Sequence, residues 1–422
     1  MTSNFYIKKR QELTDKIENN SLVILHSNYQ TFKSADSIHE FHVNNNFYYL
    51  TGLKQDNIIL VLGKINGNHF EHLFIDENDP ILVKWVGAKY TKEEASELSG
   101  IEEKNISYTT GFDKYVEMLI QPSRYSDALL DKIYLDLERR DLPLYDTFGL
   151  KYAKYLQENF PYVVIKNIYP FIINMRMYKE AEEVEEIRKS IESTRRAIYN
   201  IFSHHHLLKN EAEAVAYHDF VLTCEHKKTS FGTIMASGKN ACILHYEDNN
   251  SDIEKDSLML MDLGSSTNCY ASDISRTFPV SGKFTDRQKE IYQAVLDVNK
   301  ACIKYAKDGM TWKELNDYAK DLLAEALIRL NVMKEKSSLG EYYFHSIGHS
   351  LGLDVHDPNI ASLGIQKGMV ITIEPGLYIP EEGIGIRIED DILITDGEAI
   401  NLSESIIKEV EDLEKFMCER KN

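Results

Sequence analysis

The sequence lacks the long apolar runs and the paired cysteines that mark membrane-spanning and secreted proteins. Its 422 residues contain no apolar run of about 18 residues. Residues 1–20 have no apolar core of the kind found in signal peptides. The five cysteines are odd in number and form no CxxC pair, so we expect reduced thiols. Together these absences predict a cytoplasmic protein.

Positive charge is also scarce. Lys and Arg number 48 against 67 Asp and Glu, which gives a formal net charge of −19. Phosphate backbones and anionic lipid headgroups repel such a chain, so we expect neither nucleic acid nor a membrane surface as a partner. The hydrophobic content of 43% is that of an ordinary globular protein, and the length leaves room for two or three domains.

Residues 1–170 predict an α/β domain built on a mixed sheet. Helices are expected over residues 7–17 and 146–160. Strand-like apolar runs occupy residues 22–25, 47–50, 58–62, 73–76, 132–137 and 163–168. This part of the chain carries no group of histidines and carboxylates with the spacing of metal ligands, so we expect no chemistry of its own.

Residues 171–422 predict a second domain, in which two helices followed by a two-stranded unit occur twice. The helices are expected over residues 179–202, 211–222, 286–307 and 313–330. Residues 230–250 predict a strand, a Gly turn and a second strand that ends at His245, which by itself is more typical of a structural histidine. The repeat predicts an α+β domain with pseudo-twofold symmetry and both strand pairs at its centre.

The first strand pair carries two carboxylates. In LMLMDLGSSTNCYASDISRT, residues 258–277, the turn-prone cluster SSTN separates Asp262 from Asp273. A turn centred between Thr267 and Asn268 would place these carboxylates opposite each other, with Cβ atoms about 4.5–5.5 Å apart. Two like charges this close require a cation between them or a proton on one of them. A metal ion is the natural candidate.

A second carboxylate pair repeats this pattern. Glu374 and Glu389 are symmetric about Glu381 and Glu382, and the histidine-rich segment FHSIGHSLGLDVHD precedes them. Four carboxylates and one imidazole are enough to hold two divalent ions. Oxygen-rich donors of this kind suit Mn²⁺, Co²⁺ or Fe²⁺ better than structural Zn²⁺, which prefers sulfur and nitrogen.

Five motifs in this region resemble the pita-bread metallopeptidases, a family that includes methionine aminopeptidase, aminopeptidase P, prolidase and creatinase. The motifs are MDLG, SDISRT, HSIGHSLGLDVHD, TIEPGLYI and GIRIEDD. In the first domain, NNNFYYLTGL resembles a motif of aminopeptidase P, although His42 stands where that family usually has Arg. The resemblance implies an aminopeptidase-P-type domain over residues 1–170 and a pita-bread catalytic domain over residues 171–422.

The resemblance also implies a role for each site residue. Two divalent ions, most often Mn²⁺ with Co²⁺, Fe²⁺ or Zn²⁺ as alternatives, would be held by Asp262, Asp273, His349, Glu374 and Glu389. Catalytic roles are implied for Glu374, His245, His345, His356 and Arg387. Substrate contacts are implied for His245, His356, Arg387 and Trp85. In oligomeric relatives the equivalent tryptophan reaches the site of a neighbouring subunit.

The reaction implied by the resemblance is hydrolysis of the bond between any N-terminal residue and a penultimate proline. A hydroxide that bridges the two ions would attack the carbonyl carbon. The partners would then be peptides that begin Xaa-Pro, together with further copies of the chain in a homodimer or homotetramer. A prolidase, restricted to Xaa-Pro dipeptides, is the alternative with the same site. A peptide-binding module without activity is less consistent with the sequence, because all five ligand positions are retained.

Overall fold

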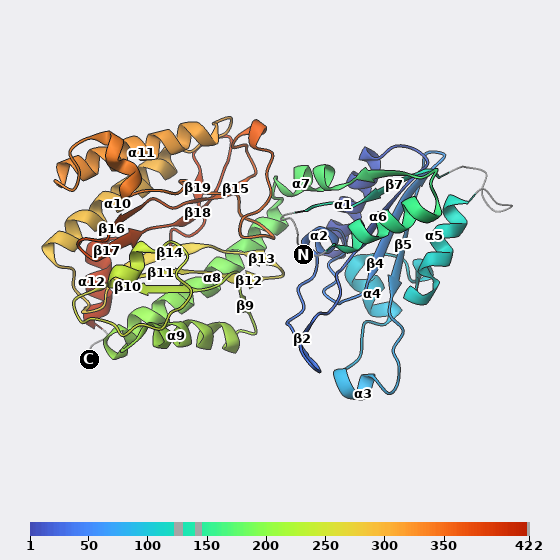
Figure 1. Ribbon diagram of the computed structural model, residues 1–422, viewed down its shortest axis with the longest axis horizontal. Helices are drawn as coiled ribbons and strands as arrows, with labels where there is room; N and C mark the ends of the chain where they lie inside the picture. The colour runs from blue at the N-terminus through green and yellow to red at the C-terminus, as the bar shows by residue number, and fades with distance from the viewer. Residues whose placement is uncertain (122–129, 140–145, 420–422) are drawn as a thin grey trace. The chain divides into compact units, whose positions relative to one another are not determined.

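The computed structural model describes residues 1–121, 130–139 and 146–419. Residues 122–129, 140–145 and 420–422, which belong to the expected domains, lie outside the described part. The chain divides into two compact units, Met1–Met175 and Arg176–Asn422 (Figure 1). Among the described residues, no helix is both long enough and apolar enough to cross a membrane.

The N-terminal unit is built on a mixed sheet of six strands in the order β6-β5-β4-β1-β7-β8. The strands are β1 (Ser21–His26), β4 (Ile59–Ile65), β5 (Asn68–Ile75), β6 (Ile106–Tyr108), β7 (Lys132–Leu135) and β8 (Val164–Asn167). β1 is antiparallel to β4 and parallel to β7. Every residue of β1, SLVILH, is buried, as expected for a central strand covered on both faces.

Helices cover this sheet. They are α1 (Ser3–Lys16), α2 (Asn45–Thr51), α4 (Lys92–Ser99), α5 (Phe112–Ile120) and α6 (Phe148–Asn159), and α7 (Tyr169–Arg176) follows the last strand. Val116 of α5 and Leu156 of α6 pack with Leu22 and Ile24 of β1 in one apolar cluster. The short elements β2 (Phe32–Ser34), β3 (Ser37–Ile38) and α3 (Val83–Val86) lie outside the sheet.

The predicted strand at residues 47–50 is wrong, because these residues form helix α2. The Asn44 side chain accepts a hydrogen bond from the Phe47 backbone N–H and so caps the start of the helix. Gly52 ends it in the left-handed conformation, with φ of 71°. A run of four apolar residues cannot by itself distinguish a buried strand from a buried helix. The flanking Asn44 and Gly52 are the sequence signals that indicate a helix here.

The C-terminal unit contains the expected repeat. Its first half comprises α8 (Ala181–His204), α9 (Glu211–Cys224), β9 (Lys228–Thr229), β10 (Ile234–Ser237), β11 (Leu258–Leu263), β12 (Ser265–Thr267), β13 (Tyr270–Ala271) and β14 (Ile274–Pro279). Its second half comprises α10 (Asp286–Tyr305), α11 (Trp312–Arg329), β15 (Val370–Ile373), β16 (Gly376–Ile379), β17 (Ile384–Arg387), β18 (Asp390–Leu393), β19 (Ile400–Asn401) and α12 (Val410–Glu419). In Figure 1 the green helix α9 lies at the lower edge of this unit and the orange helix α11 at its upper edge, with the strands between them in this view.

The two halves meet along β14. The backbone N–H of Glu389 donates to the Ser275 carbonyl at 3.0 Å, and that of Arg387 donates to Thr277 Oγ1 at 3.2 Å. Helices α8 and α9 pack on the strands of the first half, and α10 packs on those of the second. The unit is thus the predicted α+β pita-bread fold, with the carboxylate-bearing strands at its centre.

The predicted register of the first hairpin is wrong. Asn268 and Cys269 form the turn, with φ of 48° and 65°, and Asp262 therefore faces Ser275 rather than Asp273. A two-residue turn of this type needs positive φ at both central positions, which Asn tolerates and the β-branched Thr267 does not. The turn accordingly lies one residue later than predicted.

The second hairpin keeps the predicted register. β15 pairs with β18 and β16 pairs with β17, and both ladders have the register that places Glu374 opposite Glu389. One further prediction is wrong, because residues 243–245 are not a strand. A 3-10 turn, Gly238–Cys242, follows β10 instead and leads directly to His245.

Candidate active site

A single cavity of about 460 Å³ in the C-terminal unit is lined by nine of the ten predicted site residues. They are His245, Asp262, Asp273, His345, His349, His356, Glu374, Arg387 and Glu389. The tenth, Trp85, belongs to the N-terminal unit, where it lies on α3 with 82% of its surface exposed. The structure therefore brings together the predicted metal ligands, histidines and arginine in one unit, and Trp85 is not among the residues that line the cavity.

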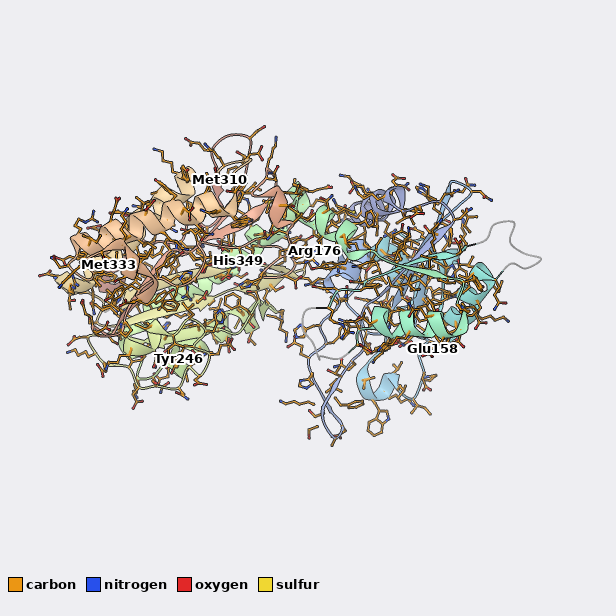
Figure 2. All side chains as sticks on the ribbon, turned by 45° about the horizontal axis from the view of Figure 1, so that its top comes forward. Glu158, Arg176, Tyr246, Met310, Met333 and His349 are labelled. Carbon is orange, nitrogen blue, oxygen red and sulfur yellow. The ribbon has the colours of Figure 1, made fainter. Side chains whose placement is uncertain are left out.

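The floor of the cavity is formed by carboxylates from both halves. Ligand atoms of Asp273, His349 and Glu389 lie within 4.8 Å of one another. His349 Nε2 is 3.3 Å from Asp273 Oδ2 and 3.8 Å from Glu374 Oε1. Figure 2 shows His349 inside the C-terminal unit. The first half contributes Asp262 and Asp273, and the second contributes His349, Glu374 and Glu389.

These acidic groups are arranged at an electrostatic cost. Burial and the repulsion of neighbouring carboxylates raise the pKa of Asp273 and of Glu389 well above their usual values. Burial raises the pKa of Glu374 to about 7. Asp262 Oδ1 and Asp273 Oδ1 are buried and have no hydrogen-bond partner among the described residues. Bound divalent cations would satisfy these oxygens and relieve the repulsion, so the residues fit a metal site.

The orientation of His349 is fixed by a hydrogen bond on the side of its ring that faces away from the carboxylates. Its Nδ1–H donates to the Ser350 carbonyl at 3.1 Å, which leaves the lone pair of Nε2 facing the carboxylates. Its segment lies beside β15, where the Thr372 N–H donates to the His349 carbonyl. Gly348 allows this close approach, because a Cβ there would lie 2.0 Å from the Thr372 carbonyl oxygen.

Arg387 connects several groups around the floor. Its Nη2 donates to Asp262 Oδ2 at 2.6 Å, its Nε donates to Ser275 Oγ at 2.8 Å, and its Nη1 donates to Tyr378 Oη at 2.9 Å. Ser275 Oγ in turn donates to Glu389 Oε2 at 2.8 Å. Sequence reasoning missed Ser275 and Tyr378. With the turn placed correctly, Ser275 could have been found as the residue opposite Asp262.

The other histidines differ in their surroundings. His345 Nδ1–H donates to the Ser346 carbonyl at 2.7 Å, and its Nε2 accepts a hydrogen bond of 2.9 Å from Tyr378 Oη. Burial lowers the pKa of His345 to about 4, so the ring is neutral. Burial also lowers the pKa of His356 to about 4, and its ring centre lies 4.0 Å from that of His349. His245 lines the cavity from the exposed loop after the 3-10 turn.

Comparison with known proteins identifies the family of the chain. The sequence profile of metallopeptidase family M24 matches residues 185–396, and that of the aminopeptidase P N-terminal domain matches residues 6–127. The Xaa-Pro aminopeptidase of Haemophilus influenzae is 30% identical over 435 residues, which cover 97% of this chain and 96% of the relative. The Escherichia coli enzyme of the same name is 30% identical over 436 residues, with the same coverage of both chains.

Solved structures agree over the whole chain. A Bacillus anthracis protein assigned as an aminopeptidase P superimposes with a TM-score of 0.96 at 41% identity. Escherichia coli aminopeptidase P with the inhibitor Pro-Leu superimposes with a TM-score of 0.90 at 27% identity. Each comparison covers 100% of this chain and 99% of the other. With half of its length matched by the family profile and nearly all of it matched by these relatives, the chain belongs to metallopeptidase family M24.

Proposed function

We propose that this protein is an Xaa-Pro aminopeptidase, a metal-dependent hydrolase that releases the first residue of a peptide when the second is proline. The observation that carries the proposal is the cavity floor, where four carboxylates and His349 converge with two buried oxygens unsatisfied. Full-length relatives of the same fold bear this name. One Escherichia coli aminopeptidase P structure contains substrate and another contains product.

Two divalent cations are proposed as the cofactor. Asp262, Asp273, His349, Glu374 and Glu389 would hold them, and the oxygen-rich donor set favours Mn²⁺. A zinc-substituted form of the Escherichia coli relative is known, so Zn²⁺, Co²⁺ and Fe²⁺ are alternatives. When bound, such ions would polarise the substrate carbonyl and lower the pKa of the attacking water.

The chain's own side chains would complete the reaction. Glu374, itself one of the proposed ligands, would also accept the proton of the attacking water and pass it to the leaving nitrogen. His245 and His356 would donate N–H groups to the carbonyl oxygen as negative charge develops there. Because both ring nitrogens of His345 are engaged within the protein, we assign it a positioning role toward Tyr378.

The leaving group imposes a shape requirement. The proline nitrogen of the scissile amide carries no N–H, so the site must recognise a ring instead of a hydrogen-bond donor. The cavity walls include Phe231, Ile234, Leu244 and Val355, which offer apolar surface for such a ring.

Assembly and location also belong to the proposal. Ile81, Leu82, Trp85 and Val86 are each more than half exposed and form an apolar group on and before α3. Such a group is typical of a protein–protein contact. We propose a homodimer or homotetramer in which Trp85 packs against a second copy, and we retain the prediction of a cytoplasmic enzyme.

The test combines metal analysis with peptide assays. We expect two equivalents of divalent metal per chain, loss of activity after chelation, and its return on addition of Mn²⁺. We also expect cleavage of a tripeptide Xaa-Pro-Xaa. Unchanged activity in chelator would refute the two-metal proposal. Strict preference for the dipeptide Xaa-Pro over the tripeptide would identify a prolidase instead.

A further inference from the structure

Glu211, at the first turn of α9, is a buried carboxylate to which the proposed mechanism gives no task. Its exposed fraction is 0%. Its Oε1 accepts hydrogen bonds from the Ser237 backbone N–H at 2.7 Å, from Ser237 Oγ at 2.8 Å and from Asn240 Nδ2 at 3.0 Å. Its Oε2 accepts from Tyr246 Oη at 2.8 Å and from the Ser251 N–H at 3.0 Å. One side chain thus receives five hydrogen bonds.

All five donors belong to one segment, residues 237–251, which we call the His245 loop. Ser237 and Ser251 are its ends, and Tyr246 lies within it next to His245. Ser251 is bonded a second time, because its carbonyl accepts the Glu211 backbone N–H at 3.0 Å. Glu211 therefore closes the loop at both ends and also holds its middle.

Tyr246 transmits this constraint to the cavity. Its ring packs in an apolar cluster with Ile234, Leu260 and Tyr378, and only its hydroxyl reaches Glu211. Both ends of the Tyr246 side chain are therefore fixed. His245 precedes it directly and faces the cavity, so its position depends on where Tyr246 is held. Figure 2 shows Tyr246 in the same unit as His349.

The charge of Glu211 is part of this arrangement. Burial by itself would raise the pKa of its carboxyl, but the surrounding hydrogen bonds outweigh burial and lower that pKa. An ionised carboxylate accepts at both oxygens. Glutamine at this position would be a neutral amide of the same shape, and its two side-chain N–H groups would face groups that also donate hydrogen bonds.

We propose that Glu211 is a positioning residue that sets the place of the His245 imidazole for the reaction. This inference rests on the proposed function, in which His245 donates to the carbonyl oxygen. Removal of one oxyanion donor lowers kcat about 10²–10³-fold, and misplacement by about 1 Å can cost about 10²-fold. We therefore expect Glu211→Gln to lower kcat by about 10–100-fold and to change KM little.

The test is a double-mutant cycle on cleavage of an Xaa-Pro-Xaa tripeptide. If Glu211 acts through His245, Glu211→Gln lowers kcat in the wild-type background and by less than about 3-fold in a His245→Ala background. Equal losses in both backgrounds, or no loss in the wild type, overturn the inference. Glu213→Gln is the matched control, since Glu213 lies on the same helical turn and bonds the Lys209 N–H rather than the His245 loop.

Two further measurements test the inference if the Glu211 variant does not fold or if the wild type proves inactive. If Glu211→Gln does not fold, Tyr246→Phe, which removes a single hydroxyl, carries the same cycle with a smaller expected loss of about 3–10-fold. If the wild type cleaves no Xaa-Pro peptide, the proposed function fails, and a crystal structure of the Glu211 variant then decides the inference. An unchanged His245 ring and loop in that structure overturn it.

Discussion

Without bound metal, the protein should be more stable after one of the proposed metal ligands is neutralised. Asp273 and Glu389 bring charged oxygens within 4.8 Å, and two unit charges at that separation repel by about 3.5 kcal/mol at an effective dielectric constant of about 20. The folded state avoids part of this cost by protonation, which agrees with the raised pKa of both groups. We therefore expect Asp273→Asn to stabilise the metal-free protein by about 1–3 kcal/mol.

The pH dependence has a defined sign. Because the folded-state pKa of Asp273 lies above its unfolded value, the folded metal-free protein binds more protons, and its stability falls as pH rises above about 4. The Asp273→Asn variant should show a weaker fall. With Mn²⁺ at about 1,000 times its Kd the order should reverse, because binding adds about 4.1 kcal/mol to the wild type and the variant lacks a proposed ligand.

Thermal unfolding in EDTA and in Mn²⁺ measures both effects. A gain of about 1–3 kcal/mol corresponds to a rise in Tm of about 2–10 °C. Glu398→Gln, a change of the same kind on an exposed residue, should leave Tm unchanged in both buffers. If Asp273→Asn lowers Tm in EDTA as well, repulsion does not dominate at this site and the case for a cation-dependent arrangement fails.

Three further predictions concern single side chains. Glu374→Gln should lower kcat by about 10²-fold or more in a tripeptide assay, because proton transfer is lost. Full activity in this variant would refute the role of Glu374 in proton transfer. Burial lowers the pKa of His26 to about 4, so the contribution of its neutral ring to folding stability should be fully present above about pH 6.5 and should decline toward pH 4. When urea unfolding is compared at pH 7 and pH 5, His26→Gln should lose less stability than the wild type. Asp357, next to His356 in the sequence, forms buried ion pairs with both Arg176 at 2.6 Å and Lys179 at 3.0 Å. Asp357→Leu should cost about 3–5 kcal/mol in urea unfolding, because it removes the carboxylate that these two buried cations share. A cost below about 1 kcal/mol would contradict that reasoning.

Much of the site could be predicted because most of the proposed metal ligands lie on or next to strand pairs whose pattern is visible in the local sequence. The symmetry of Glu374 and Glu389 about their loop gave the correct register. The register of the first hairpin was predicted wrongly, because the position of its turn is set by the backbone preference of Asn268 and not by the position of the polar cluster as a whole. Prediction of the fold class rested on the repeat and on the family motifs, which are both local in sequence.

The remaining parts depend on contacts between distant segments. Tyr378 and Ser275 meet at Arg387 only once the two halves pack together. Glu211 gave no sequence signal, because a glutamate at the start of a helix is typical of simple charge–dipole stabilisation. Its five donors come from residues 237–251, and only the folded chain brings them to one point.

The division of ligands between the two halves has a mechanical consequence. Asp262 and Asp273 come from the first half, and His349, Glu374 and Glu389 come from the second. Ions bound by ligands from both halves would crosslink the two halves across the pseudo-twofold axis, in addition to the backbone hydrogen bonds along β14. After a protease cut in the connection between β14 and α10, bound ions would therefore continue to hold the two fragments together. Chelation of the ions would weaken this association. Metal binding would therefore add to the structural integrity of this unit as well as to its chemistry.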